Sequence, residues 1–265
     1  MVKVVIDPGH GGTDSGAVNG SYREKDFTLQ IGLKVRDYLL SNYNVEVLMT
    51  RTTDKTVSLG ERTNYANNQN ANYFCSIHIN AGGGTGWESY IYNGSVSDKT
   101  IAAQNTIHST VMGVIGSKYG VRDRGKKRAN FHVLRESKME AILLENLFID
   151  TTADLNLLKS SAFITDLSNA IGEGIAKALS LSGGGGTPGK LYKVIAGSFQ
   201  ERQNAVNRQN FLADNGIEAA ITTVTVSGKT YYRVQAGAFK DKANAEARLN
   251  QVKALGITDA FILYE

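Results

Sequence analysis

Residues 2–12 read Val-Lys-Val-Val-Ile-Asp-Pro-Gly-His-Gly-Gly, so an apolar, β-branched run is followed at once by proline and glycines. The run predicts a buried strand that ends at Asp7, and Pro8 with the glycines predicts a turn. Open α/β sheets bind ligands in the loops that follow the carboxyl ends of strands. His10 therefore stands where a functional loop is expected.

Short apolar runs of the same kind alternate with segments of helical periodicity over residues 1–181. We expect strands at Val2–Ile6, Val45–Thr50, Tyr73–Ile79, Trp87–Tyr92, Phe131–Leu134 and Ala141–Phe148. We expect helices around Phe27, Ile31 and Val35, after the capping-box pair Ser58 and Glu61, and over Asp98–Lys118 and Ser160–Leu181. This alternation predicts an α/β layer structure with a mostly buried sheet.

The composition of the chain, which has 265 residues, excludes several classes of protein. Hydrophobic residues make up 42%, which is typical of a globular protein, and no apolar run approaches the ~20 residues that span a bilayer. The single cysteine, Cys75, excludes a disulfide framework and a cysteine-rich zinc site, but not a zinc site of histidine and glutamate. The net charge of +4 is small, and we expect the basic tract Lys126–Arg128 to be a solvated loop.

A glycine-rich stretch at residues 182–189 predicts a flexible linker between residues 1–181 and 190–265. The second part contains an internal repeat, because Tyr-Lys-Val-Ile-Ala-Gly-Ser-Phe at 192–199 returns as Tyr-Arg-Val-Gln-Ala-Gly-Ala-Phe at 232–239. Each copy reads strand, helix, strand. Two copies predict a small α+β domain of βαββαβ (ferredoxin-like) topology, with both helices on one face of the sheet.

Several residues of the first part could carry chemistry. His10, Glu24 and His78 would supply two imidazoles and one carboxylate, a ligand set of catalytic zinc sites. They also have structural readings as a turn residue, a helix-dipole partner and a hydrogen-bonded core histidine. Glu145 interrupts the apolar run Ala141–Phe148, so it is either a buried structural acid or a general base with an adjustable pKa.

An ordered set of motifs runs through the first part: residues 4–12, Glu24-Lys25, Ser-Ile-His-Ile-Asn-Ala at 76–81, Asn-Phe-His-Val-Leu-Arg at 130–135 and Leu-Leu-Glu-Asn-Leu-Phe-Ile-Asp at 143–150. The set resembles the zinc-dependent N-acetylmuramoyl-L-alanine amidases of sporulation autolysins and phage endolysins. That resemblance implies a twisted mixed sheet flanked by helices. It also implies a peptidoglycan hydrolase that cleaves the amide between N-acetylmuramic acid and the first L-Ala of the stem peptide.

The resemblance assigns roles to individual residues. It implies that His10, Glu24 and His78 bind Zn²⁺ and that Glu145 is the catalytic acid/base. His132 and Arg135 are further candidates for substrate contact, although a surface charge ending a strand is an alternative reading of Arg135. His108, on a predicted helix, is expected to be structural.

Residues 190–265 resemble the sporulation-related (SPOR) repeat, which binds glycan strands stripped of their stem peptides. Strand alternation puts Tyr232, Val234 and Ala236 on one face and Arg233 and Gln235 on the other. The resemblance implies that the polar pair lies on the open, glycan-binding face, although a solvated face explains it equally. Ile195 replaces the family's glutamine in the first copy, which argues against equal use of the two halves.

Two other classes of function fit the sequence less well. A non-catalytic wall-binding protein would not need the complete set of candidate active-site residues, and an RNA binder of this topology would carry interleaved basic and aromatic residues on its sheet. We therefore expect peptidoglycan as the partner, no nucleic acid and no membrane insertion. The first residues lack a signal-peptide pattern, so we expect synthesis in the cytoplasm and action on the wall after release through holin pores or mother-cell lysis.

Overall fold

The computed structural model describes residues 1–183, 191–226, 228–239 and 242–264. The chain forms two compact units, one of Met1–Leu39 with Val45–Leu181 and one of Ser182–Glu265 with Leu40–Asn44. The predicted linker falls outside the described residues from Gly184 onward. Within the described ranges, no helix is both long enough and apolar enough to cross a membrane.

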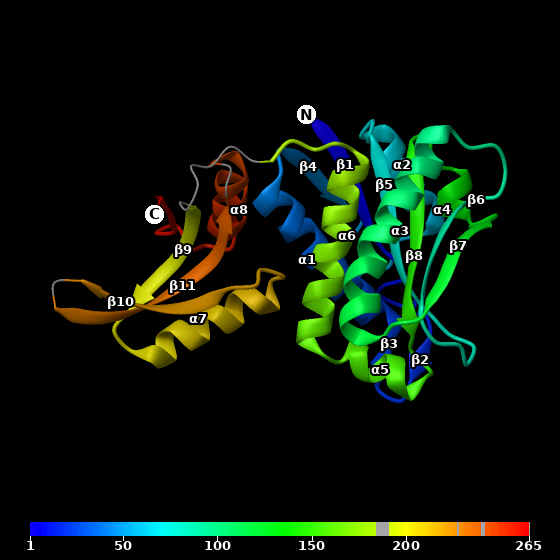
Figure 1. Cartoon of the computed structure of the whole chain (residues 1–265). Helices are drawn as coiled ribbons and strands as arrows, with labels where there is room; N and C mark the ends of the chain where they lie inside the picture. Colours follow the sequence, from blue (N-terminus) through cyan, green and yellow to red (C-terminus); the bar gives the residue numbers. More distant parts are fainter. Residues whose placement is uncertain (184–190, 227, 240–241, 265) are drawn as a thin grey trace. The chain divides into compact units, whose positions relative to one another are not determined.

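The first unit is built on a mixed sheet with the strand order β4-β1-β5-β8-β6-β7 (Figure 1). Its strands are β1 (Val2–Pro8), β4 (Val45–Met49), β5 (Tyr73–Asn80), β6 (Trp87–Tyr92), β7 (Asp123–Ala129) and β8 (Glu140–Phe148), and a small hairpin comprises β2 (Val18–Asn19) and β3 (Tyr22–Arg23). β4, β1, β5 and β8 run parallel, whereas β6 is antiparallel to β8 and parallel to the edge strand β7. The predicted α/β fold is confirmed.

Helices cover both faces of this sheet. They are α1 (Glu24–Asn42), α2 (Leu59–Asn68), α3 (Asp98–Tyr119), α4 (His132–Arg135), α5 (Thr152–Leu158) and α6 (Ser161–Ala178). α3 and α6 pack side by side (Figure 1). Ser89 of β6 points toward α3, because its Oγ lies 2.9 Å from Nδ1 of His108 on that helix. On the other face, α2 and α4 pack together over a core that includes Val5, Phe74 and Leu143. α2 begins at Ser58 with the predicted capping box.

Two expectations for this unit are wrong. Phe131–Leu134 is not a strand, because α4 begins at His132 and buries the adjacent side chains of Val133 and Leu134, which one face of a strand could not do. The tract Lys126–Arg128 is not a loop but part of β7. Charged residues are common on edge strands, since they discourage pairing with another chain.

The second unit has the predicted βαββαβ order in its described residues. Its elements are β9 (Tyr192–Phe199), α7 (Arg202–Asp214), β10 (Ala220–Val226), β11 (Lys229–Phe239), α8 (Lys242–Ala254) and β12 (Phe261–Tyr264). The sheet has the order β10-β11-β9-β12, and all neighbouring strands are antiparallel. Val234 and Ala236 are buried with Ala205 of α7 and Ala245 of α8. The intervening residues of β11 therefore point to the face away from the helices.

Candidate active site

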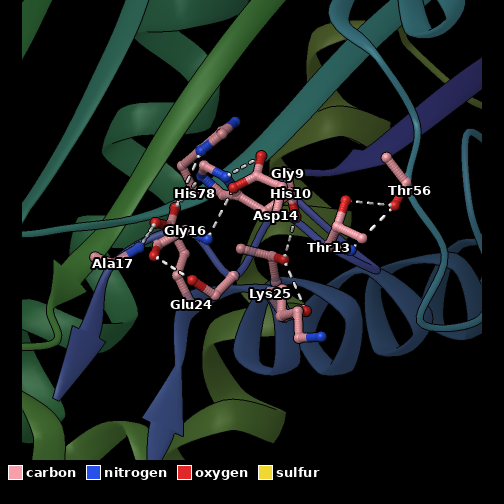
Figure 2. A network of polar contacts seen from close by, with 12 residues as sticks. Gly9, His10, Thr13, Asp14, Gly16, Ala17, Glu24, Lys25, Thr56 and His78 are labelled. Carbon is pink, nitrogen blue, oxygen red and sulfur yellow. Dashed lines mark hydrogen bonds and ion pairs between the residues drawn. The ribbon is translucent and has the colours of Figure 1, made fainter.

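Three side chains that are distant in the sequence meet beside the carboxyl ends of β1 and β5 (Figure 2). Glu24 Oε1 lies 3.1 Å from His10 Nε2 and 3.1 Å from His78 Nδ1. One ligand atom from each of the three residues lies within 4.8 Å of the others. This is the geometry of a cluster that can hold a metal ion.

Glu24 is the first residue of α1, and only 4% of its surface is exposed. The backbone N–H of Ile79 donates to Oε1 and that of Ala17 donates to Oε2, each over 2.9 Å. Burial opposes ionisation, but the hydrogen bonds to His10 and His78 hold the pKa of Glu24 well below its usual range. The carboxylate is therefore ionised and fixed in direction.

His10 occupies a tight loop with a backbone φ of +59°, a conformation that residues with a Cβ seldom adopt. Asp14 lies four residues further on, and its Oδ2 is 2.8 Å from His10 Nδ1 (Figure 2). This contact leaves Nε2 directed at the cluster. A side chain at the preceding Gly9 would displace the His78 ring, because a Cβ there would lie 2.3 Å from it. Burial lowers the pKa of His10, but the Glu24 and Asp14 carboxylates outweigh it and raise that pKa above its ordinary value.

Two buried arginines stabilise the loop that contains His10 by donating hydrogen bonds to its backbone carbonyls. Arg51 Nη2 donates to the carbonyl of Gly9 over 2.8 Å, and Arg62 Nη2 donates to the carbonyl of His10 over 2.7 Å. Arg62 Nη1 also forms a 2.7 Å ion pair with Asp7, which is fully buried. No sequence motif singled out Arg51, Arg62 or Asp14. For two of them the available signal was position, since Arg51 follows β4 of the mixed sheet and Asp14 stands in the loop of His10.

Glu145 faces the same side of the sheet as His78, because the two residues are register partners on β8 and β5. Its buried Oε2 has no hydrogen-bond partner among the residues that the structure describes. Burial is the largest influence on this carboxyl group and raises its pKa to about 7. A carboxyl with that pKa can accept and return a proton near neutral pH.

A cavity of about 360 Å³ adjoins these groups and is lined by His10, His78 and Glu145. His132, the first residue of α4, also lines it, and the buried Nε2 of His132 has no partner within the described part of the chain. Arg135 is not brought to this cavity. It contacts Glu136 and Asn130 and lines a different hollow.

His108 is held in the interior, as expected for a structural residue. Its Nδ1 lies 2.9 Å from Ser89 Oγ, and its Nε2 lies 2.9 Å from Asp123 Oδ1. Although serine, histidine and aspartate stand in a row, the Ser89 side chain is fully buried and no described cavity reaches it. The row therefore links β6, α3 and β7 without forming a second reaction centre.

Comparison with known proteins defines the class to which this fold and site belong. Residues 4–177 match the N-acetylmuramoyl-L-alanine amidase family, and residues 188–264 match the SPOR domain. The first match covers more than half of the chain, so the protein belongs to the N-acetylmuramoyl-L-alanine amidase family. It is a peptidoglycan hydrolase with a SPOR domain, and the alternative of a non-catalytic wall-binding protein is not supported.

Individual relatives agree with this assignment. The chain is 50% identical over 206 residues to the sporulation-specific N-acetylmuramoyl-L-alanine amidase of Bacillus subtilis, covering 77% of this chain and 78% of that protein. It is 43% identical over 202 residues to the endolysin of Bacillus phage SPP1, covering 74% of each. The catalytic domain of the amidase CwlV from Bacillus (Paenibacillus) polymyxa superposes with a TM-score of 0.64 at 35% identity, covering 69% of this chain and 100% of that one.

Proposed function

We propose that His10, Glu24 and His78 hold a Zn²⁺ ion and that Glu145 is the acid/base in hydrolysis of the amide between N-acetylmuramic acid and L-Ala. The observation that carries this proposal is the convergence of three ligand atoms within 4.8 Å beside a carboxyl group with an unpartnered oxygen. Cleavage at the first residue of the stem peptide follows from membership of the amidase family.

The donor set supports zinc as the ion. Two imidazoles and one carboxylate are typical of catalytic zinc sites, which leave a further position open. Asp14 supports the same choice, since the second ring nitrogen of a zinc-bound histidine commonly contacts a carboxylate, a backbone carbonyl or water, which orients the ring. A bound Zn²⁺ would polarise the scissile carbonyl and lower the pKa of a water ligand to ~7.

The chain's own residues would perform the proton transfers. Glu145 accepts a proton from the attacking water, and the C–N bond breaks as Glu145 returns that proton to the leaving amine of alanine. Its raised pKa suits both steps near neutral pH. His132 lines the same cavity, and its Nε2 has no partner among the described residues, so it is suited to contact the substrate beside the scissile bond. Arg135 does not line this cavity, so its position does not support a contact with the substrate.

The second unit is proposed to anchor the enzyme to glycan strands that lack stem peptides. Arg233 and Gln235 alternate with the buried Val234 and Ala236, so they stand on the sheet face that the helices leave open. We further propose that residues 1–181 form the catalytic domain, 182–189 a linker and 190–265 the binding domain. The wall is the proposed site of action, reached after holin or mother-cell lysis, in keeping with the names of its endolysin and sporulation-specific relatives.

Product analysis with a variant pair tests the catalytic assignment. Wild-type protein should release stem peptides with a free N-terminal alanine from purified walls, as read by mass spectrometry. Glu145→Gln should slow this release by ~10²–10⁴-fold, the usual contribution of a general acid–base. The control is Glu140→Gln at the opposite end of β8, which should remain near normal. A near-normal rate in Glu145→Gln would mean that the base lies elsewhere.

A further inference from the structure

The sheet continues past Glu145 through β6 and β7, and a second buried carboxylate stands directly beside it. Glu88 of β6 is the register partner of Glu145, so both side chains point to the same face of the sheet. Glu88 is 1% exposed. Burial of a carboxylate costs free energy unless cations or hydrogen-bond donors compensate, so its partners define its role.

Two cations of the edge strand converge on Glu88. Arg124 Nε donates to Oε2 over 2.8 Å, and Lys127 Nζ forms a shorter contact with the same oxygen. Tyr90 OH donates to Oε1 over 2.9 Å. These contacts outweigh burial and keep the pKa of Glu88 below its ordinary value. Two positive charges against one negative leave a surplus of +1 next to the reaction centre.

A β-bulge in β7 directs the side chains of both cations to the same face of the sheet. Residues three apart on a regular strand point to opposite faces, yet Arg124 and Lys127 both reach Glu88. The register explains this, because Trp87 pairs with Asp123 and Ser89 pairs with Lys126, which leaves one extra residue on β7. Gly125 supplies the necessary backbone with a φ of +89°.

Both cations retain capacity to bind a further group. The side chains of Arg124 and Lys127 are 26% and 36% exposed. Arg124 Nη2 makes no hydrogen bond to any residue that the structure describes, and its guanidinium lies 4.7 Å from the centre of the Phe148 ring. Lys127 Nζ lies 5.7 Å from the ring centre of Tyr90, which packs on Phe131 of the cavity wall. The two cations do not line the cavity of Glu145 themselves, but Lys127 is linked to its wall through Tyr90 and Phe131.

We propose that Arg124 and Lys127, held by Glu88, bind a free carboxylate of the stem peptide and so select acidic stems over amidated ones. Two strand spacings separate β7 from β8, or about 10 Å. An extended peptide covers about 3.5 Å per residue, so a carboxylate two or three residues beyond the scissile amide reaches the pair. The inference deepens the proposed function, since it takes Glu145 as the reaction centre.

Two synthetic muropeptides test this subsite, one with a free carboxylate on the second stem residue and one with a carboxamide there. Wild-type protein should cleave the carboxylate form with a kcat/KM about 10-fold higher, the effect of one charge-assisted hydrogen bond. Lys127→Gln should lose that preference, because its kcat/KM for the carboxylate form should fall toward its kcat/KM for the carboxamide form. The matched control is Lys126→Gln, which removes the same charge from the other face of β7, where Lys126 contacts Asn105 of α3.

Equal cleavage of the two muropeptides by the wild type would overturn the subsite. So would an equal loss on both muropeptides in Lys127→Gln, or a loss of preference in Lys126→Gln that matches Lys127→Gln. The wild-type comparison needs no variant to fold. Failure of the underlying proposal looks different, because Glu145→Gln would then cleave both muropeptides at a normal rate.

Discussion

The cluster of His10, Glu24 and His78 and the open sheet face of the second unit use polar residues in opposite ways. In the cluster, buried hydrogen bonds fix the position of each side chain, and Arg51 and Arg62 stabilise the loop that contains His10. On the open face, Arg233 and Gln235 stand half-buried on a strand. Bond cleavage needs groups held in one geometry, whereas adhesion to a polymer can use a repeated, tolerant surface. The comparison predicts that changes in the cluster have much larger effects.

Metal removal should have the largest effect, because it should abolish catalysis at the cluster and leave wall binding by the second unit unchanged. A chelator should abolish release of stem peptides, and added Zn²⁺ should restore it. Binding of the same protein to sacculi should be unchanged, since the SPOR domain does not contribute to the cluster. Turnover assays and pelleting assays on one preparation measure both. Full turnover in the chelated protein would contradict the metal assignment.

Loss of an arginine beneath the cluster should destabilise the fold strongly. Arg62→Met leaves the carboxylate of Asp7 buried without its cation, so the free energy of unfolding should fall by about 3 kcal/mol. The exposed Arg202 of the second unit is the matched control, and Arg202→Met should change stability by less than about 0.5 kcal/mol. Urea unfolding of the two variants compares them. Equal, small changes would show that the Asp7–Arg62 pair contributes little.

The raised pKa of Glu145 predicts a pH-dependent cost in the metal-free protein. The folded state binds the proton of Glu145 up to about pH 7, whereas the unfolded chain releases it near 4.5, so this group lowers stability as pH rises through that window. In the metal-free protein, Glu145→Gln should be more stable than wild type at pH 8 by about 3 kcal/mol, with a much smaller gain at pH 4. Unfolding curves at both values check this, and a pH-independent difference would count against the raised pKa.

The smallest effect is expected on the open face. Gln235→Ala should weaken wall binding a few-fold, in line with the ~1 kcal/mol of an ordinary hydrogen bond, and leave cleavage of soluble muropeptides unchanged. Gln203→Ala on α7 is the control. Pelleting is best done in the Glu145→Gln background, with sacculi that were or were not pretreated with wild-type enzyme. Stronger binding to the pretreated walls is expected if stripped glycan is the ligand.

Much of the architecture could be read from the sequence because it rests on periodicity. The apolar run before His10, the capping box at Ser58 and the repeat at 192–199 and 232–239 all correspond to elements of the fold. The prediction of a strand at Phe131–Leu134 was wrong because a short apolar run suits a helical turn and a strand equally well. The prediction of a loop at Lys126–Arg128 was wrong because charged residues occur both in loops and on edge strands.

The candidate site could be read only in part. His10, Glu24, His78 and Glu145 stand in motifs, so their residue types suggested their chemistry. Arg51 and Arg62 act through backbone carbonyls of the His10 loop, a contact that depends on how separate segments pack. The orientation of the Lys127 side chain depends on the β-bulge at Gly125, which changes the sheet face to which the following residues point. Strand alternation in the sequence does not reveal such a bulge.

Elemental analysis of zinc in purified wild type, His78→Ala and His132→Ala decides whether His10, Glu24 and His78 hold the metal ion. We expect one zinc per chain in the wild type, clear loss in His78→Ala, and a full complement in His132→Ala, with circular dichroism confirming that each variant is folded. His132 lines the same cavity but is absent from the cluster, so it is the appropriate control. Full zinc content in a folded His78→Ala, with loss in His132→Ala, would contradict the assignment and move the metal to the α4 side of the cavity.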